Sequence, residues 1–294
     1  MFVFKADIPM EEDDFRLLRD FVYQYCGLYF DSDSKYLLEK RLNKRLSHHR
    51  LETFRDYYYL LRYGHEKEQE LAAVIDLLTT NETYFFREDF QLKTFVEEII
   101  PELCEQKRKR GDHTLRIWSA GCSSGEEPYT VAMLLLENPD LSGWDINIVG
   151  TDICQEVLTK ARHGLYGTNS FRGTDDYYLQ KYFTPSPEEE NIWKIDDRVK
   201  QLVTISRLNL FDSRRVSVLG EVDLIFCRNV IIYFDLNSKR QVITNLRDRL
   251  SPGGFLLLGH SESLMNISTD FQLRHFVNDM VYQLPLSPPG GKHD

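Results

Sequence analysis

The spacing of hydrophobic residues divides this chain into two parts. Between residues 12 and 105, apolar residues recur at steps of three and four, as in Leu38, Leu42 and Leu46. This period is typical of amphipathic helices. From Leu115 onward, short β-rich runs alternate with helical segments, which is typical of parallel βαβ units. The pattern therefore predicts a helical N-terminal part followed by an α/β part.

We expect four regions along the chain. They are an all-α domain over residues 1–90, a linker helix and loop over 91–113, a doubly wound α/β domain over 114–286, and a disordered tail over 287–294. The tail is expected because two prolines and two glycines stand at the chain end. Within the α/β domain, a Pro-Ser-Pro turn and alternating residues interrupt the βαβ rhythm at about 167–204. A small antiparallel β insertion is expected there.

The first strand of the α/β domain runs into a glycine-bearing turn. After the β-rich run at Thr114–Trp118 come Gly121 and Gly125, and then a helix that begins with Glu126 and Glu127. Glycine allows a sharp turn and a close approach to a ligand, and the N–H groups of a first helical turn form a polar cradle. A strand, turn and helix in this order indicate a nucleotide-type cofactor, although the spacing is not that of a G-x-G-x-x-G motif.

Polar residues follow several of the other predicted strands. Asp152 ends the buried run Ile146–Ile153, and an acid at this place binds ribose hydroxyls in doubly wound folds. Ligands of an open parallel sheet lie at the carboxyl ends of its strands. We therefore expect one rim to carry Gly121 and Asp152 together with Arg228, Asn229 and Tyr233, which follow a later strand.

The composition is that of an ordinary soluble protein. Of 294 residues, 42% are hydrophobic and 28% are charged. No apolar run approaches the length of a membrane span, and the N-terminus has no apolar core of a secretory signal, so we expect a cytoplasmic location. The five cysteines include no CxxC pair, which predicts neither a disulfide framework nor a metal site.

The charge is uneven along the chain. The net charge of −10 argues against nucleic-acid binding. Residues 35–62 nevertheless contain eight basic and three acidic side chains. Helical spacing places Lys40, Arg41, Lys44 and Arg45 together, opposite the leucine stripe. This basic face is either a solvated helix surface or a docking face for an acidic partner.

The segment Asn81–Glu88 mixes aromatic and β-branched residues with polar ones. Such a segment can bury Phe85 and Phe86 while it presents polar side chains to a cleft. The polar side chains in question are Asn81, Thr83 and Arg87.

Four motifs in this order resemble the CheR-type chemotaxis-receptor glutamate methyltransferases. They are Asn81–Glu88, Trp118–Tyr129, Phe226–Asp235 and Gly259–Ser263. The resemblance covers nearly the whole chain. It implies a Rossmann-like methyltransferase domain behind an all-α receptor-docking domain, with S-adenosylmethionine as the methyl donor. The acceptors that it implies are glutamate carboxylates on chemoreceptor signalling helices, which become methyl esters during sensory adaptation.

The resemblance also assigns roles to residues. Those expected to bind the cofactor are Asn81, Thr83, Arg87, Gly121, Glu127, Asp152, Asn209, Leu210, Arg228 and Asn229. Arg87 and Tyr233 resemble the pair that faces the reacting centre. Ser119 stands where many methyltransferases have an acid, so Glu127 is our candidate for the methionine ammonium, and the division of work between Glu126 and Glu127 is left open.

The resemblance implies a partner as well. An acidic helical region of the receptor would dock on Lys40, Arg41, Lys44 and Arg45. Some relatives also tether a receptor tail peptide as an edge strand of the insertion. The turn between Tyr182 and Trp193 is acidic and lacks the glycine pair that we associate with tethering, which predicts weak or no tail binding. We expect a monomer that reaches the membrane only through its receptor.

Two other functions are compatible with parts of the pattern. An NAD-dependent oxidoreductase would also use Asp152, but the missing G-x-G-x-x-G motif and the segment Asn81–Arg87 argue against it. A non-catalytic nucleotide- or receptor-sensing module would keep the fold. The joint presence of Arg87, Glu127, Asp152 and Tyr233 argues for catalysis.

Overall fold

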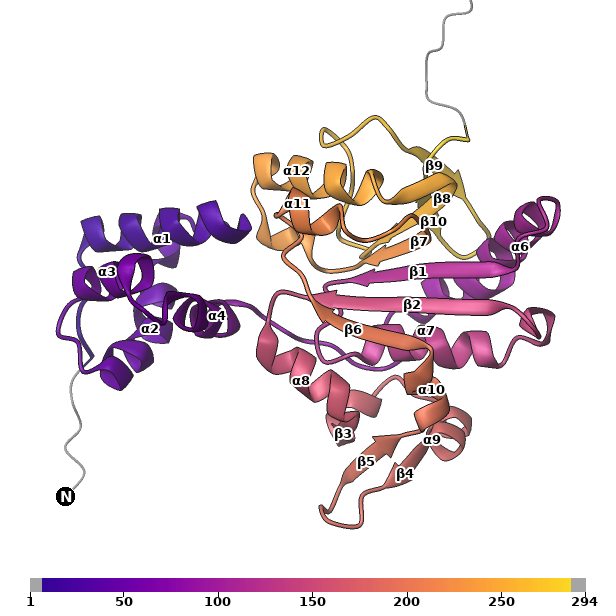
Figure 1. Ribbon diagram of the computed structural model, residues 1–294, viewed down its shortest axis with the longest axis horizontal. Helices are drawn as coiled ribbons and strands as arrows, with labels where there is room; N and C mark the ends of the chain where they lie inside the picture. The colour runs from indigo at the N-terminus through magenta and orange to yellow at the C-terminus, as the bar shows by residue number, and fades with distance from the viewer. Residues whose placement is uncertain (1–6, 287–294) are drawn as a thin grey trace, which may run out of the picture. The chain divides into compact units, whose positions relative to one another are not determined.

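The computed structural model describes residues 7–286 and divides the chain into two compact units (Figure 1). The N-terminal unit ends at Thr80 and also includes Tyr233–Ser238. The α/β unit comprises Asn81–Ile232 and the chain from Lys239. The first division therefore falls before residue 90, where we placed the domain boundary. The expected linker helix belongs to the α/β unit, and the predicted tail at 287–294 lies outside the described residues.

The N-terminal unit is helical, as its periodicity predicts. Its helices are α1 (Glu12–Cys26), the 3-10 turn η1 (Ser32–Ser34), α2 (Lys35–His49), α3 (Phe54–Tyr63) and α4 (Lys67–Leu78). The leucine stripe of α2 is fully buried. Gly27 ends α1 in the left-handed region with φ 74°, and the Thr53 side chain caps α3 by accepting from the Asp56 N–H.

A buried carboxylate joins three helices of this unit. Glu70 of α4 accepts hydrogen bonds from Arg45 of α2 at 2.5 Å and from the Tyr57 hydroxyl of α3 at 2.5 Å. Its Oε2 also lies 2.7 Å from His49 Nε2. Burial raises the pKa of Glu70, but the hydrogen bonds from Arg45, Tyr57 and His49 outweigh it and lower the pKa to about 2.

The helices of the α/β unit connect and cover a large sheet. They are α5 (Asp89–Thr94), the π-helix η2 (Phe95–Ile99), α6 (Ile100–Arg108), α7 (Glu126–Leu136), η3 (Pro139–Leu141), α8 (Gln155–His163), η4 (Thr168–Phe171), α9 (Asp176–Tyr182), α10 (Asp197–Gln201), α11 (Ser213–Val216), η5 (Ile231–Tyr233) and α12 (Leu236–Arg247). The last residue of η5 and the first turn of α12 group with the N-terminal unit.

The large sheet has seven strands in the order β6-β2-β1-β7-β8-β10-β9. Their bounds are β1 (Thr114–Ala120), β2 (Asp145–Asp152), β6 (Val203–Arg207), β7 (Val222–Cys227), β8 (Leu250–Leu258), β9 (Gln272–His275) and β10 (Met280–Gln283). The first five in the sheet order pair in parallel, and β10 and β9 close the edge in antiparallel fashion. Figure 1 shows β2, β1 and β7 side by side.

The strand order reverses direction beside β1. From β1 the chain builds β2 and β6 outward on one side, and then returns to place β7 and β8 on the other. Crevices for ligands form at the carboxyl ends of the strands at such a switch point. The fold therefore brings the loops after β1, β2 and β7 to one rim, as the sequence predicts.

The expected insertion is a three-stranded antiparallel sheet. It consists of β3 (Leu165–Gly167), β5 (Ile192–Ile195) and β4 (Phe183–Pro185) in that order. Figure 1 shows β4 and β5 beyond the β6 edge of the large sheet. Its aromatic side chains pack on the core of the α/β unit, with Phe85 stacked on Phe171 at a centroid distance of 5.5 Å.

The strand β8 is longer than the sequence pattern indicates. We expected Pro252-Gly253-Gly254 to be a break before a strand at residues 255–259, but β8 begins at Leu250. Its pairing with β7 shifts register between Val222 and Leu224. A register irregularity of this kind accommodates proline and a glycine of positive φ within a strand.

Two features of the described residues complete the fold. All five cysteines are buried and free. Within residues 7–286, no helix combines the length and the apolar character that crossing a bilayer requires.

Candidate functional site

The glycine turn after β1 is tightly packed. Gly121 has a φ of 87°, and a Cβ added there would lie 2.4 Å from Cγ2 of Val230, in the loop after β7. Gly125 has a φ of 94° and precedes the first residue of α7, and a Cβ there would meet the Tyr129 ring at 2.9 Å. The N–H groups of Gly121 and Cys122 both donate to the carbonyl of Thr151. The turn therefore requires glycine for backbone angle and for space.

Asp152, at the end of β2, holds the turn from the other side. Its Oδ2 accepts the N–H of Ser123 at 2.8 Å, and its Oδ1 accepts the N–H of Cys154 at 2.9 Å. Its backbone carbonyl accepts from Leu208, at the end of β6. A carboxylate oxygen accepts more than one hydrogen bond, so the position remains suited to ribose hydroxyls.

A cluster of charges lies between the starts of α7 and α5 and the end of β7. The Arg228 guanidinium lies 3.5 Å from Glu127 Oε2 and 3.3 Å from Glu88 Oε2, and its Nη2 donates to the Arg87 carbonyl at 2.5 Å. Ser119 donates its hydroxyl to Glu127 at 2.6 Å. Arg228 Nε is buried and has no hydrogen-bond partner among the described residues. One arginine thus joins the glycine turn to the segment that carries Arg87.

The two glutamates at the start of α7 have different surroundings. Glu126 turns toward the insertion, where its carboxylate accepts from the hydroxyls of Ser124 and Ser170 at 2.8 and 3.0 Å. Glu127 lies in the charge cluster. Burial raises the pKa of Glu127, and Arg228 opposes that rise. Burial also raises the pKa of Glu126. Of the two, Glu127 is the one that faces Arg228.

The segment Asn81–Glu88 is anchored to the α/β unit through its backbone. The Ser123 hydroxyl donates to the Asn81 carbonyl at 3.2 Å. The N–H of Phe85 donates to the Ser170 carbonyl, and the N–H of Phe86 donates to the Thr130 hydroxyl. Phe85 is fully buried as expected, whereas Phe86 is partly buried. These contacts bring the Asn81 and Arg87 backbones beside the glycine turn and Arg228.

The remaining predicted residues of the cofactor site make contacts of their own. The Arg87 side chain donates to the Glu82 carbonyl at 2.8 Å, and Thr83 is half-buried in the same segment. Asn209 follows β6, and its side-chain oxygen accepts the N–H of Phe211. The carbonyl of Leu210 accepts from Asn245 of α12. Asn209 and Leu210 thus follow β6, which pairs with β2, the strand that ends at Asp152.

Tyr233 groups with the N-terminal unit. Its backbone carbonyl accepts the Tyr29 N–H at 3.1 Å, and 37% of the residue is exposed. Its pairing with Arg87 stays a prediction.

The basic face of α2 has two kinds of cation. The Arg41 side chain donates to the Leu78 carbonyl at 2.8 Å, and Arg45 pairs with the buried Glu70. Both arginines are thus used inside the N-terminal unit. Lys40 and Lys44 are exposed.

Sequence reasoning assigned no role to three site residues. Ser119 and Glu88 belong to the charge cluster just described. Glu262 accepts backbone N–H groups from the loop after β7. Glu88 and Glu262 stand in motifs that we noted, but their partners lie far along the chain, so only their place within those motifs signalled them.

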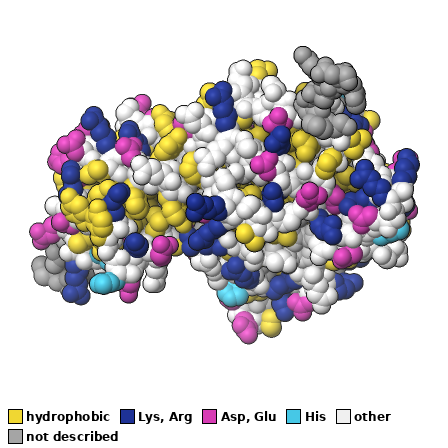
Figure 2. All heavy atoms as spheres, turned by 45° about the horizontal axis from the view of Figure 1, so that its top comes forward, with side chains coloured by type: hydrophobic (Ala, Val, Ile, Leu, Met, Phe, Trp, Pro, Cys, Tyr) yellow, Lys and Arg dark blue, Asp and Glu magenta, His cyan; other side chains and the backbone are white. Residues whose placement is uncertain are grey.

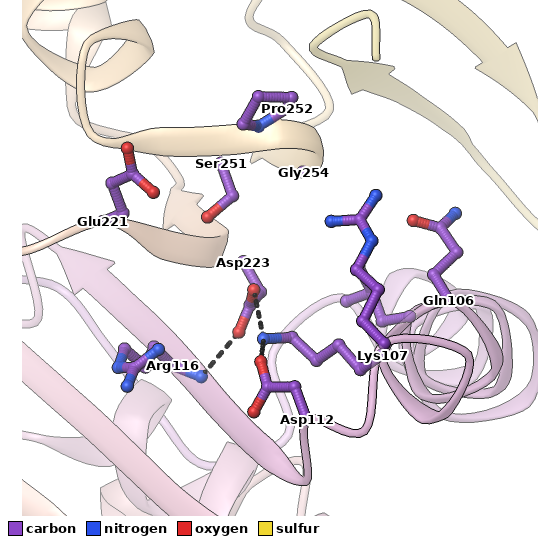
Figure 3. Close-up of a pocket in the computed structure, with 11 residues that line it drawn as sticks. Gln106, Lys107, Asp112, Arg116, Glu221, Asp223, Ser251, Pro252 and Gly254 are labelled. Carbon is purple, nitrogen blue, oxygen red and sulfur yellow. Dashed lines mark hydrogen bonds and ion pairs between the residues drawn. The ribbon is translucent and has the colours of Figure 1, made fainter.

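A cavity of about 230 Å³ lies elsewhere (Figure 3). Lys107 points into it and pairs with Asp112 at 2.9 Å and Asp223 at 2.8 Å, and Asp223 also accepts the Arg116 N–H. Asp112 precedes β1 and Asp223 stands near the start of β7, so the cavity is at the amino ends of these strands. The Lys107 ammonium bridges the two carboxylates and so ties the start of β7 to the segment before β1, which indicates a structural role.

The charge balance of the rim fits the expected cofactor. The carboxylates of Asp152, Glu127 and Glu88 accompany the guanidinium groups of Arg228 and Arg87, and Arg87 contributes to the field at Glu127. Among these five groups, carboxylates outnumber guanidinium groups by one. S-adenosylmethionine, with its sulfonium, ammonium and carboxylate, carries one net positive charge.

The chain matches two family models over nearly all of its length. Residues 13–79 match the all-alpha domain of CheR methyltransferases, and residues 81–278 match their SAM-binding domain. The second match begins at the first residue of the α/β unit.

Curated relatives agree with these matches. The chain is similar to chemotaxis protein methyltransferase 2 of Vibrio cholerae, with 40% identity over 98% of this chain and 97% of that protein. It is also similar to chemotaxis protein methyltransferase 1 of Pseudomonas aeruginosa (34% identity, 92% of this chain and 97% of the other) and to chemotaxis protein methyltransferase of Salmonella typhimurium (32%, 91% and 89%). With both domains matched and these identities spanning the chain, the protein belongs to the CheR methyltransferase family and uses S-adenosylmethionine as its cofactor.

Proposed function

We propose that this protein transfers a methyl group from S-adenosylmethionine to glutamate side chains of a chemoreceptor, in the cytoplasm. The observation that carries the proposal is the 40% identity to a chemotaxis methyltransferase over 98% of the chain. The product is a glutamyl methyl ester. Methylation of this kind removes one negative charge from the receptor at each modified position.

Methyl transfer to a glutamate carboxylate needs little acid–base catalysis. A glutamate carboxylate is ionised at neutral pH because its ordinary pKa is about 4.3. It therefore needs no general base. Since a carboxylate is a weak nucleophile, orientation and partial removal of water are what a protein must supply. When bound, S-adenosylmethionine supplies an electrophilic methyl group on its sulfonium.

The residues of the rim divide into binding and orienting groups. Asp152 is proposed to bind the ribose hydroxyls, and Glu127 the methionine ammonium. Arg87 is proposed to orient the acceptor carboxylate by charged hydrogen bonds. Tyr233, which follows the loop after β7 in the chain, is proposed to contact the same carboxylate through its hydroxyl. Asn81, Thr83, Gly121, Asn209, Leu210, Arg228 and Asn229 complete the proposed cofactor site.

The partner is proposed to be an acidic helical region of the receptor that docks on α2. The docking surface comprises the exposed Tyr36, Leu37, Lys40 and Lys44. The Lys40 ammonium lies 5.9 Å from the centre of the Tyr36 ring. Figure 2 shows hydrophobic side chains gathered on the N-terminal unit with Lys and Arg side chains among them. Apolar contact gives affinity and positive charge guides an acidic helix.

The half-buried arginines of α2 have a supporting part in this proposal. Arg41 and Arg45 hold α2 against α4, since their side chains bond Leu78 and Glu70. Reversing the charge of Arg45 would place two carboxylates together in a buried network. The lysines are therefore the residues on which docking is best tested.

Tail-peptide tethering is proposed to be weak or absent. The turn between β4 and β5 carries Glu188, Glu189 and Glu190, which are all exposed. We also propose that the protein is a monomer that meets the membrane only through its receptor.

Incubation with a tritiated methyl donor and candidate receptors tests the function. The expected result is receptor label that mild base releases, because methyl esters hydrolyse where methylamines do not. Asp152→Ala is expected to abolish labelling, whereas Glu189→Ala, at an exposed glutamate of the insertion, is the matched control. Binding of the donor with no base-labile label on any receptor would instead favour a non-catalytic sensing module.

A further inference from the structure

The loop after β7 forms a concavity of backbone N–H groups. Asn229 adopts a left-handed conformation with φ 58°. This turns the N–H groups of Asn229, Val230 and Ile232 toward one point. Successive N–H groups that converge after a left-handed residue form an anion-binding nest. The anion here comes from the chain itself.

Glu262 fills the nest. Its Oε2 accepts from Asn229 and from Gly259, both at 2.8 Å, and its Oε1 accepts from Val230 at 2.9 Å and Ile232 at 3.3 Å. Burial raises the pKa of Glu262, and the backbone N–H groups oppose that rise because they favour the ionised form. Four donors directed at one carboxyl group match the acceptor capacity of a carboxylate.

The surroundings leave the loop few other arrangements. A Cβ at Gly259 would lie 2.8 Å from the Asn229 side chain and 3.0 Å from Glu262. Val230 packs against Gly121, where the space for a side chain is already taken. Arg228, the residue before the nest, joins Glu127 and Glu88. The nest therefore connects the end of β8 to the charge cluster and the glycine turn.

We propose that Glu262 is a positioning residue of this methyltransferase: its carboxylate fixes the Asn229–Ile232 loop and thereby holds Arg228 and Asn229 in place to bind S-adenosylmethionine. The inference rests on the proposed cofactor contacts of Arg228 and Asn229. It does not depend on which carboxylate accepts the methyl group.

Two variants separate positioning from stability. Glu262→Gln keeps the volume, but its amide presents an NH₂ group to two backbone donors. Glu262→Ala opens a space lined by four N–H groups. We expect the Kd of S-adenosylmethionine, measured by isothermal titration calorimetry, to rise about tenfold to a hundredfold in each, as a displaced binding loop predicts. Glu189→Ala, at an exposed glutamate, is the control and is expected to bind like the wild type.

Rescue by a small anion gives a second readout. Formate or acetate is expected to restore much of the donor affinity of Glu262→Ala, because a free carboxylate can occupy the nest. Neither is expected to help Glu262→Gln, in which the amide still fills the space. Sodium chloride at the same ionic strength is the comparison.

Three outcomes would overturn the proposal. One is a donor Kd within twofold of the wild-type value in folded Glu262→Gln, with only the melting temperature lowered. Another is equal rescue of both variants, which would indicate a general salt effect. The third is a folded Glu262→Ala that binds donor weakly and is not rescued by either carboxylate. If the alanine variant does not fold, the glutamine variant decides. Failure to methylate receptors would leave these binding results standing.

Discussion

Gly121 illustrates at the scale of one residue how closely two loops of the site approach. Its φ of 87° and the 2.4 Å that would separate an added Cβ from Val230 both oppose a side chain. We expect Gly121→Ala to destabilise the protein by about 1–2 kcal/mol from the backbone alone. The displaced loop is also expected to weaken binding of S-adenosylmethionine at least tenfold. Chemical denaturation and calorimetric titration measure the two effects.

Gly111 provides the matched control for this substitution. It has a φ of 71°, but an added Cβ would meet nothing within 4 Å. Gly111→Ala is therefore expected to cost similar backbone energy and to leave donor affinity unchanged. Equal donor affinity in Gly121→Ala and the wild type would contradict a cofactor role for the turn. Adding Val230→Ala to Gly121→Ala should recover part of the affinity, since it removes the clash.

The site residues differ in how far their positions can be predicted from the sequence. Asp152 and Glu127 stand at a strand end and a helix start, where their positions are set by local pattern. Glu262 binds backbone N–H groups some 30 residues away in the chain. Backbone donors carry no side-chain signature, so no pattern of residue types points to that contact. The partner of Glu88 is Arg228, which is so distant in the chain that hydrophobic periodicity does not predict their contact.

The same contrast holds at the scale of elements. The helices of the N-terminal unit and the parallel strands follow from hydrophobic periodicity because packing faces repeat along each element. Periodicity alone does not predict which basic residues of α2 are exposed. We expected Arg41 and Arg45 opposite the leucine stripe, but both side chains reach α4, where Leu78 and Glu70 accept their hydrogen bonds. The acceptors on α4 therefore determine that the two arginines are partly buried, whereas Lys40 and Lys44 remain exposed.

The exposed lysines of α2 are expected to carry receptor docking. Lys40→Glu with Lys44→Glu should lower the rate of receptor methylation about tenfold at low salt, because charge complementarity acts on association. The deficit should shrink as ionic strength rises and screening shortens the reach of the charges. The affinity for S-adenosylmethionine should not change. Initial rates at several salt concentrations provide the measurement.

A charge reversal elsewhere in the N-terminal unit controls for net charge. Lys67 is exposed at the start of α4. Lys67→Glu is expected to leave the rate of receptor methylation close to that of the wild type. A comparable loss in Lys67→Glu would show that general electrostatics, rather than the docking surface, guides the receptor.

At the scale of the whole molecule, the two units hold their buried carboxylates in opposite ways. Glu70 of the N-terminal unit is paired, which lowers its pKa to about 2. Glu126 and Glu127 of the α/β unit have pKa values raised by burial. A carboxylate whose pKa is lower in the folded state than in the unfolded state stabilises the fold, and this stabilisation is lost as the pH falls. A carboxylate whose pKa is raised by folding favours the folded state more as the pH falls. Four other carboxylates of the α/β unit have lowered pKa values, namely Glu105, Asp112, Glu137 and Asp196. They pair with lysine or arginine at or near the surface, where ion pairs contribute little, so they offset this only weakly.

Acid should therefore unfold the N-terminal unit first. The stabilisation from Glu70 is present above about pH 4.5 and is lost as the pH falls toward 2, which amounts to about 3 kcal/mol for the shift that its pairing produces. All three tryptophans lie in the α/β unit, so their fluorescence follows that unit, while far-UV circular dichroism also registers the helices of the other. We expect helical signal to be lost before the fluorescence changes. Glu70→Gln should be less stable at neutral pH and should flatten the acid dependence of the helical signal. Coincident transitions in the wild type would mean that the two units unfold together and that the buried network of Glu70 does not set the acid limit.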